Sequence, residues 1–383
     1  MIAYKEIAQI KNVKGVNPIT GDYSYEENGR GYLCIDGVLL EKEEAASKIV
    51  SVGEYTYVRY NRYGTLEVYS GHTLLKVFER DIRLLDGDVG AYVGYRIYTP
   101  KTLDASENIL SISDGQPLLL HNVPYWLYKV GEEIIGYKIL ECKLSRLNYS
   151  GEVLWTFDLP LRPRSGEPDN LDKVLGIAQG LLWICTRWYR LIALNLETGK
   201  PVHQFSGGWF DEDHSNYIVL DSLGWCFFRE AEKTIVLISN FGVQILDAAT
   251  AKIIEGYSFS EVDPQGIGAF EYFDAARLYG DCLTFIAQRH REAHGYRCAG
   301  IFDLKARQFS WIGDIISLEE KMSTGNHLIA QFPLQMEGNR LYIKDAENTL
   351  HIYQKEWRLK AQVRPQSEAT AFAVCATTPT VGR

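Results

Sequence analysis

The stretch that decides the fold is Leu191–Phe205, which reads LIALNLETGKPVHQF. Ile192, Leu194 and Leu196 alternate with smaller or polar residues, so one face of a strand is apolar. A Thr-Gly pair follows and turns the chain, because glycine tolerates the positive φ that hairpin turns need. The residues after this turn begin a second strand. The stretch therefore predicts a β-hairpin with one buried face.

Weaker copies of this hairpin recur along the chain, 36 to 56 residues apart. That spacing is close to one four-stranded propeller blade, which takes roughly 40–50 residues. The sequence therefore predicts an all-β protein, a β-propeller of seven blades with four antiparallel strands each, or of eight blades if the terminal strands form their own. The copies are LEVYSGHTLLKVF around Gly71, LSISDGQPLLL around Gly115, LNYSGEVLWTF around Gly151, QILDAATAKII around Ala251 and IFDLKARQFSW around Arg307.

A single domain over residues 1–383 is expected, since no low-complexity linker interrupts the repeats. Residues 1–45 contain a further hairpin around Asp36, and we expect it to close the ring with the C-terminal strands, which removes exposed sheet edges. This hairpin could instead belong to another full blade. Residues 364–383 are rich in alanine and threonine and form either a terminal strand or a tail.

Two of the copies, LNYSGEVLWTF and IALNLETGKPVHQF, resemble the strand-turn-strand phrase of PQQ-like propeller repeats, which are WD-repeat-like. In those repeats a tryptophan often follows the turn glycine, as Trp155 follows Gly151. The resemblance covers most of the chain as degenerate repeats and implies a propeller. It carries no activity, because one fold hosts many functions. No position matches the calcium-binding acid or the cofactor-stacking tryptophan of PQQ enzymes, so no cofactor is expected.

The composition limits the classes of partner. The chain has 40 basic and 49 acidic side chains, a net charge of −9, which argues against a nucleic-acid or anionic-membrane binder and suits a basic partner. No apolar run reaches the ~18 residues of a membrane span, and the first residues lack the apolar core of a signal peptide. The seven cysteines include no CxxC pair. We expect them to be reduced core residues of a cytoplasmic protein.

The strand order of a propeller predicts which loops could form a binding site, even where no sequence motif is present. The loops that join strand four of one blade to strand one of the next lie at the same end as the loops between strands two and three. We expect the binding site at this end, where all blades converge. The inter-blade loops are residues 161–172, 206–216 and 260–268, and the inner loops are residues 61–64, 186–190 and 288–296.

The loop at 206–216 places an aromatic pair beside three carboxylates. Aromatic anchors rimmed by charge are typical of a protein-binding hot spot. The aromatic rings could instead fill the gap between two blades while the acids are solvated. A metal site is not predicted, because the longer alternation of oxygen ligands in a calcium loop is missing. The residues concerned are Trp209, Phe210, Asp211, Glu212, Asp213 and His214.

Two inner loops carry basic clusters. Arg289, His290, Arg291 and His294 could bind an acidic group or supply a general base, or could form a solvated hairpin tip. In the other loop a tryptophan with flanking arginines could stack on a ring or bind carboxylates, or could cap the neighbouring blade. That second cluster is Arg187, Trp188 and Arg190.

No sequence signature assigns a catalytic residue: GxSxG, GxxxxGK[ST], HExxH and GxGxxG are all absent. We therefore expect a non-enzymatic, cytoplasmic propeller that binds another protein through one loop face, in its most specific form a bacterial toxin-neutralising (immunity) protein or a scaffold. The alternative is a propeller lyase or hydrolase for a glycan or small ester. Its base would be His290, His294 or His214, and Arg187 or Arg289 would stabilise charge.

Overall fold

A computed structural model describes most of the chain, and within the described residues it is a ring of four-stranded antiparallel sheets with three short helices. The all-β propeller prediction is confirmed. The described residues are 2–17, 20–52, 55–60, 65–78, 82–84, 92–97, 106–111, 117–118, 125–162, 165–188, 190–206, 225–292, 295–330 and 334–357. No helix in these ranges is long and apolar enough to cross a membrane.

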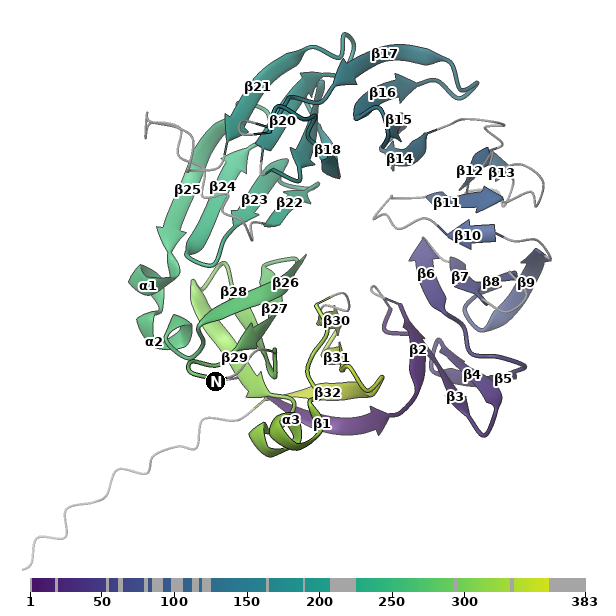
Figure 1. Ribbon diagram of the computed structural model, residues 1–383, viewed down its shortest axis with the longest axis vertical. Coiled ribbons are helices and arrows are strands. Elements are labelled where there is room, and N and C mark those ends of the chain that lie inside the picture. The colour runs from purple at the N-terminus through teal and green to yellow at the C-terminus, as the bar shows by residue number, and fades with distance from the viewer. Residues whose placement is uncertain are drawn as a thin grey trace, which may run out of the picture.

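The sheets follow the chain in order around the ring (Figure 1). The first two are β2 (Val13–Val16), β3 (Tyr23–Glu27), β4 (Arg30–Ile35), β5 (Val38–Lys42), and β6 (Lys48–Val52), β7 (Tyr55–Arg59), β8 (Leu66–Ser70), β9 (Thr73–Phe78). The next two are β10 (Ile82–Leu84), β11 (Tyr92–Ile97), β12 (Ser106–Ser111), β13 (Pro117–Leu118), and β14 (Trp126–Val130), β15 (Glu133–Lys138), β16 (Lys143–Leu147), β17 (Val153–Asp158).

The second half of the ring repeats the pattern. Its first two sheets are β18 (Leu171–Ala178), β19 (Leu181–Thr186), β20 (Arg190–Asn195), β21 (Pro201–Ser206), and β22 (Trp225–Arg229), β23 (Thr234–Ile238), β24 (Gly242–Asp247), β25 (Lys252–Ser258). Then come β26 (Tyr272–Tyr279), β27 (Cys282–Gln288), β28 (Cys298–Asp303), β29 (Gln308–Asp314), and finally β30 (Gln335–Glu337), β31 (Arg340–Lys344), β32 (Leu350–Trp357) with β1 (Ile2–Ile10). The helices are α1 (Phe259–Val262), α2 (Pro264–Ile267) and α3 (Leu318–Thr324).

Both ends of the chain build the last sheet, as predicted. Strand β1 is its outer strand and pairs antiparallel with β32, from Ile2 opposite Trp357 to Ile10 opposite Leu350. The expectation that the hairpin around Asp36 closes the ring is corrected, because that hairpin is β4–β5 of a separate sheet that starts at β2. The described residues therefore form eight sheets, the count that the sequence left open beside seven. Residues 364–383 lie outside the described residues.

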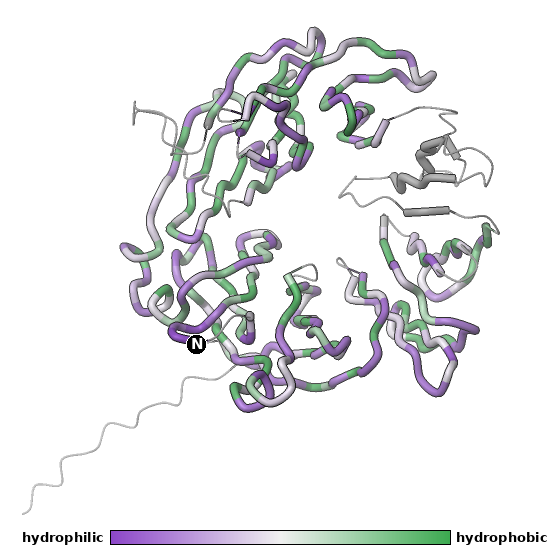
Figure 2. The backbone as a smooth tube through the Cα atoms, viewed as in Figure 1, coloured by the Kyte–Doolittle hydropathy of each residue, from purple (hydrophilic) through white to green (hydrophobic). Residues whose placement is uncertain are grey.

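The hydrophobic core lies between consecutive sheets. One cluster joins Trp183 and Leu191 of one sheet to Leu237 and Leu246 of the next, and another joins Val236 to Phe285 and Phe302. Hydrophobic residues are spread over all coloured sheets of the ring, with no single central core (Figure 2). Such clusters join consecutive sheets from β14–β17 round to β6–β9, so this part of the ring is held by many similar sheet-to-sheet contacts. The six described cysteines are free thiols.

The tryptophan of the resemblance has a structural role between two blades. Trp155 on β17 is 8% exposed, and its Nε1 donates a hydrogen bond to the Leu196 carbonyl at 2.7 Å, in the β20–β21 turn of the next sheet. Its ring covers Gly199, where φ is +67° and an added Cβ would lie 2.6 Å from the ring. The Thr-Gly turn therefore needs glycine both for its backbone conformation and for the approach of Trp155.

The outer strands share a β-bulge. Where β9, β17, β21 and β25 pair with the third strand of their sheets, one residue is left without a partner: Leu75, Leu154, Val202 and Ile254, respectively. These side chains are 49% to 59% exposed. Bulges interrupt the regular edge that another strand could extend, so we attribute the recurring bulge to protection of the ring's rim against edge-to-edge pairing.

Candidate functional site

The predicted loop face is formed as the topology requires. The loop between β17 and β18 contacts the β19–β20 turn, because the Arg187 amide donates to the Asn170 carbonyl at 2.9 Å. The loop between β25 and β26 contacts the β27–β28 turn in the same way, through the Glu271 amide and the Gln288 carbonyl at 2.9 Å. Inter-blade loops and strand-two-to-strand-three turns therefore lie at one end of the ring, which we call the loop face.

Large apolar side chains are exposed on consecutive turns of the loop face. The β15–β16 turn exposes Leu140 at 100%, the β19–β20 turn exposes Trp188 at 39%, and the β23–β24 turn exposes Phe241 at 69%. Leu161, from the loop between β17 and β18, is 59% exposed. We call Leu140, Leu161, Trp188 and Phe241 the loop-face patch. Sequence reasoning found only Trp188, because a single apolar residue beside a turn is common in any β protein.

The predicted cluster Arg187, Trp188 and Arg190 divides into two roles. The Arg162 guanidinium lies 5.9 Å from the centre of the Trp188 ring, and Arg187 is exposed beside it. Arg190 is 8% exposed, and its Nη2 donates to the Leu161 carbonyl at 2.7 Å. Trp188 and Arg187 are thus available to a ligand, whereas Arg190 holds the inter-blade loop in place.

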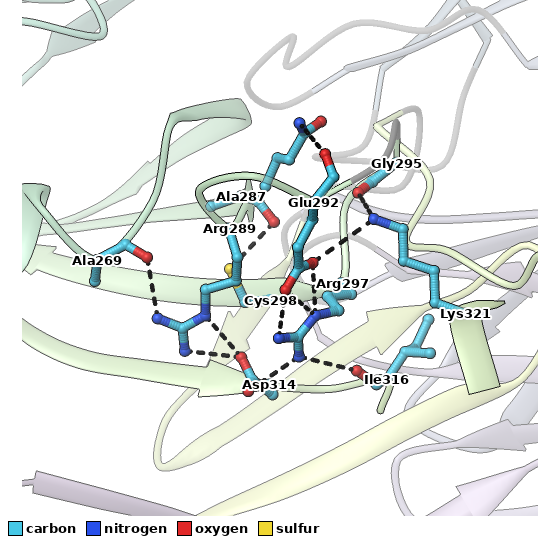
Figure 3. Close-up of polar contacts among 11 residues, drawn as sticks. Ala269, Ala287, Arg289, Glu292, Gly295, Arg297, Cys298, Asp314, Ile316 and Lys321 are labelled. Carbon is cyan, nitrogen blue, oxygen red and sulfur yellow. Dashed lines mark hydrogen bonds and ion pairs between the residues drawn. The ribbon is translucent and has the colours of Figure 1, made fainter. Parts of the chain in front are cut away.

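The basic loop at 288–296 is anchored by a network of ion pairs (Figure 3). Arg289 donates through Nε and Nη2 to Asp314 at 2.9 and 2.7 Å, and through Nη1 to the Ala269 carbonyl. Arg297 binds the Glu292 carboxylate through Nε and Nη2, with a shortest distance of 2.6 Å. Lys321 of α3 donates to the Gly295 carbonyl at 2.8 Å. His290 and Arg291 are exposed at the tip.

The electrostatics of this network keep its members charged. Hydrogen bonds from Arg297 lower the pKa of Glu292 and outweigh its burial. For Asp314, burial raises the pKa, but hydrogen bonds from Arg289 and Arg297 outweigh burial and lower it overall. Burial raises the pKa of the neighbouring Cys298 to about 12, so this thiol stays protonated. The network therefore fixes the loop and offers no group poised to exchange a proton near neutral pH.

Replacing Glu292 by Gln is expected to destabilise this loop by about 3 kcal/mol, because Arg297 is left partly unpaired in a buried setting. The side chains of Glu292 and Arg297 are only 11% and 10% exposed. Hydrogen exchange of the amides between β27 and β28 would report the loss. Glu319→Gln on exposed α3 is the matched control and should leave exchange unchanged. Equal protection in both variants would show that the network does not anchor the loop.

Part of the predicted site lies outside the described residues, namely Trp209, Phe210, Asp211, Glu212, Asp213, His214 and His294. Within the described ranges no three His, Cys, Asp or Glu side chains come together to hold a metal ion.

Sequence reasoning missed a groove at the opposite end of the ring, where the β2–β3, β4–β5 and β30–β31 turns meet. Its volume is about 580 Å³. Asp22, Asp36 and Glu337 line it, but they are far apart in the sequence and follow no metal-binding or catalytic pattern. Only the pairing of the N-terminal and C-terminal strands brings them together.

Comparisons with known proteins agree with the fold. No model of a protein family matches the sequence, and no curated protein matches it significantly. The C-terminal WD40 domain of Sif2 matches with a TM-score of 0.54 and 13% identity, over 92% of this chain and 98% of that chain. Saccharomyces cerevisiae Sqt1 matches with a TM-score of 0.52 and 10% identity, over 92% and 98%. BamB from Moraxella catarrhalis matches with a TM-score of 0.45 and 12% identity, over 92% and 100%.

At these identities the Sif2 and Sqt1 structures show the β-propeller fold alone. The specific resemblance to PQQ-like repeats stays a prediction.

Proposed function

We propose that this chain is a non-enzymatic, protein-binding propeller whose contact surface is the loop-face patch. The observation that carries the proposal is the exposure of Leu140, Trp188 and Phe241 on the strand-two-to-strand-three turns of three consecutive sheets. Apolar and aromatic side chains that protrude from fixed turns lose little conformational entropy on binding. Tryptophan and arginine are also among the residues enriched in interface hot spots.

The charge distribution suggests the kind of partner. The net charge of −9 favours encounter with a protein that carries a basic surface. Close to Trp188, Arg162 and Arg187 flank the ring; Arg162 already pairs with Glu167 at 3.1 Å, which leaves Arg187 as the exposed cation. A carboxylate of the partner would pair there once the complex has formed. The more specific form of the proposal is a cytoplasmic toxin-neutralising (immunity) protein or scaffold of a bacterium.

The alternative, a lyase or hydrolase, requires a histidine and an arginine to face one reacting atom. Arg289 is instead held by Asp314 and the Ala269 carbonyl, and His290 lies exposed at the loop tip. This arrangement favours binding over catalysis at that loop.

Affinity capture from a native extract tests the proposal. We expect one stoichiometric partner with the wild-type chain and at least about tenfold less of it with Trp188→Ala/Phe241→Ala, because hot-spot residues contribute about 2 kcal/mol or more each. Leu154→Ala is the matched control, since Leu154 is 53% exposed on an outer strand away from the loop face. Equal capture by the double variant, or no partner at all, would contradict the proposal.

A further inference from the structure

The groove opposite the loop face has the size and position of a ligand site. It spans the seam where the last sheet (β30–β32 with β1) meets the first two sheets of the chain. Its volume of about 580 Å³ falls within the ~300–1,000 Å³ typical of small-molecule sites. Because the groove and the loop face lie at opposite ends of the ring, a ligand here would not compete with a partner on the loop face.

Asp22 supplies a buried negative charge to this groove. The residue is 9% exposed, and its Oδ1 and Oδ2 accept hydrogen bonds from the Asp36 amide at 3.0 Å and the Thr20 hydroxyl at 2.6 Å. Among the described residues, no lysine or arginine forms an ion pair with Asp22. Burial raises the pKa of Asp22, since the two hydrogen bonds do not fully compensate the lost hydration. A cation bound in the groove would supply the positive charge that no described lysine or arginine supplies to Asp22.

The rest of the lining fits a cation with an aliphatic chain. Asp36 and Glu337 add two carboxylates, of which Asp36 also lies 3.9 Å from the exposed His72 imidazole, while Arg340 is the one basic residue among the described lining residues. The ring of Tyr342 is held in place, because its hydroxyl donates to Glu337 at 3.1 Å and its face covers Gly21, where a Cβ would lie 2.4 Å away. Ile7, the bulged residue of β1, is 50% exposed and forms an apolar wall.

We propose that this groove binds a primary ammonium group, with the nitrogen against Asp22 and Asp36 and the attached alkyl chain along Tyr342 and Ile7. Three carboxylates against one guanidinium repel anions and attract cations. An ammonium group offers three donors and is small enough to reach a buried carboxylate. The same chemistry is available from a free diamine and from a lysine side chain of a protein, and the test separates these two sources.

Calorimetric titration at low ionic strength tests the proposal with cadaverine and with Nα-acetyl-lysine methylamide. We expect both to bind the wild-type chain, and the Nε-acetylated form of the lysine compound not to bind. Tighter binding of cadaverine would identify free diamines as the ligand, and tighter binding of the lysine compound would identify a protein side chain. Absence of binding by both amines would overturn the proposal.

Substitutions of residues that line the groove test where the ammonium group binds. Asp22→Asn is expected to weaken binding by about 10- to 100-fold, because a buried charge-assisted hydrogen bond becomes a neutral one. Asp36→Asn/Glu337→Gln alters only exposed lining carboxylates, so it provides a second test if Asp22→Asn does not fold. Glu27→Gln, exposed on β3 and outside the groove, is the control with the same charge change as Asp22→Asn. Wild-type affinity in both groove variants would overturn the assignment.

Discussion

Replacing His351 by Gln is expected to loosen the closure of the ring by about 3 kcal/mol near pH 6, since it removes a buried cation from between two carboxylates. His351 on β32 is 4% exposed. Its Nδ1 lies 2.8 Å from Glu6 of β1, and its Nε2 lies 3.2 Å from Asp345. Asp345 also accepts a hydrogen bond from Asn326 at 2.8 Å. The imidazolium therefore joins the two ends of the chain.

The same contact makes the closure depend on pH. Burial lowers the pKa of His351, but hydrogen bonds to Asp345 and Glu6 outweigh burial and raise the pKa above its ordinary value of 6.5. Stability from a raised pKa is complete below pH 6.5 and is lost as the pH rises through the folded-state pKa. The pKa of Asp345 is lowered from 3.8, so its contribution is lost only as the pH falls below 3.8. The pairing of β1 with β32 should be most stable between about pH 4 and 6.5.

Hydrogen exchange of β1 amides, corrected for intrinsic rates, would measure this closure directly at pH 6 and pH 9. In wild type, the opening free energy of β1 should fall from pH 6 to pH 9, whereas in His351→Gln it should change little. The amides of β19 serve as the internal control, because that strand lies in another sheet. If wild type and variant respond alike to pH, His351 does not couple the termini through its charge.

The elements that could be predicted from the sequence are those defined by local pattern. The alternation around Leu194 and the turn at Gly199 recur closely enough to give the propeller and the end of the ring where loops gather. The contact between His351 and Glu6 joins residues 345 positions apart, and no local pattern indicates it. The same limit applies to the groove, where Asp22 and Glu337 meet only after the ring has closed.

Trp188 illustrates the limit at the candidate site. The sequence singled it out as an aromatic residue between two arginines, without deciding whether it caps a blade or faces solvent. Trp188 is 39% exposed beside Arg162, and the burial of Arg190 shows that the neighbouring arginine holds the loop. The companions Leu140 and Phe241 needed the structure, because each looks like an ordinary strand residue until its turn is placed at the loop face.

Replacing Gly199 by Ala is expected to destabilise the chain by about 3 kcal/mol, more than the ~1–2 kcal/mol that a left-handed backbone alone costs a residue with a Cβ. The extra cost arises because the new methyl group would lie 2.6 Å from the Trp155 ring and force that side chain away from the Leu196 carbonyl. Gly180→Ala is the matched control: its φ is +75°, and a Cβ there meets no atom within 4 Å.

A double-mutant cycle separates the clash from the backbone strain. Trp155→Ala alone should cost about 3–5 kcal/mol, because it empties a buried site between two blades. Once the ring is gone, Gly199→Ala has little left to displace and should cost only about as much as Gly180→Ala. Chemical denaturation of the four proteins of the cycle and the control would give these values. If Gly199→Ala costs as much without Trp155 as with it, glycine is required at this turn by its backbone alone, and the docking of tryptophan on the next blade adds nothing to the choice of residue.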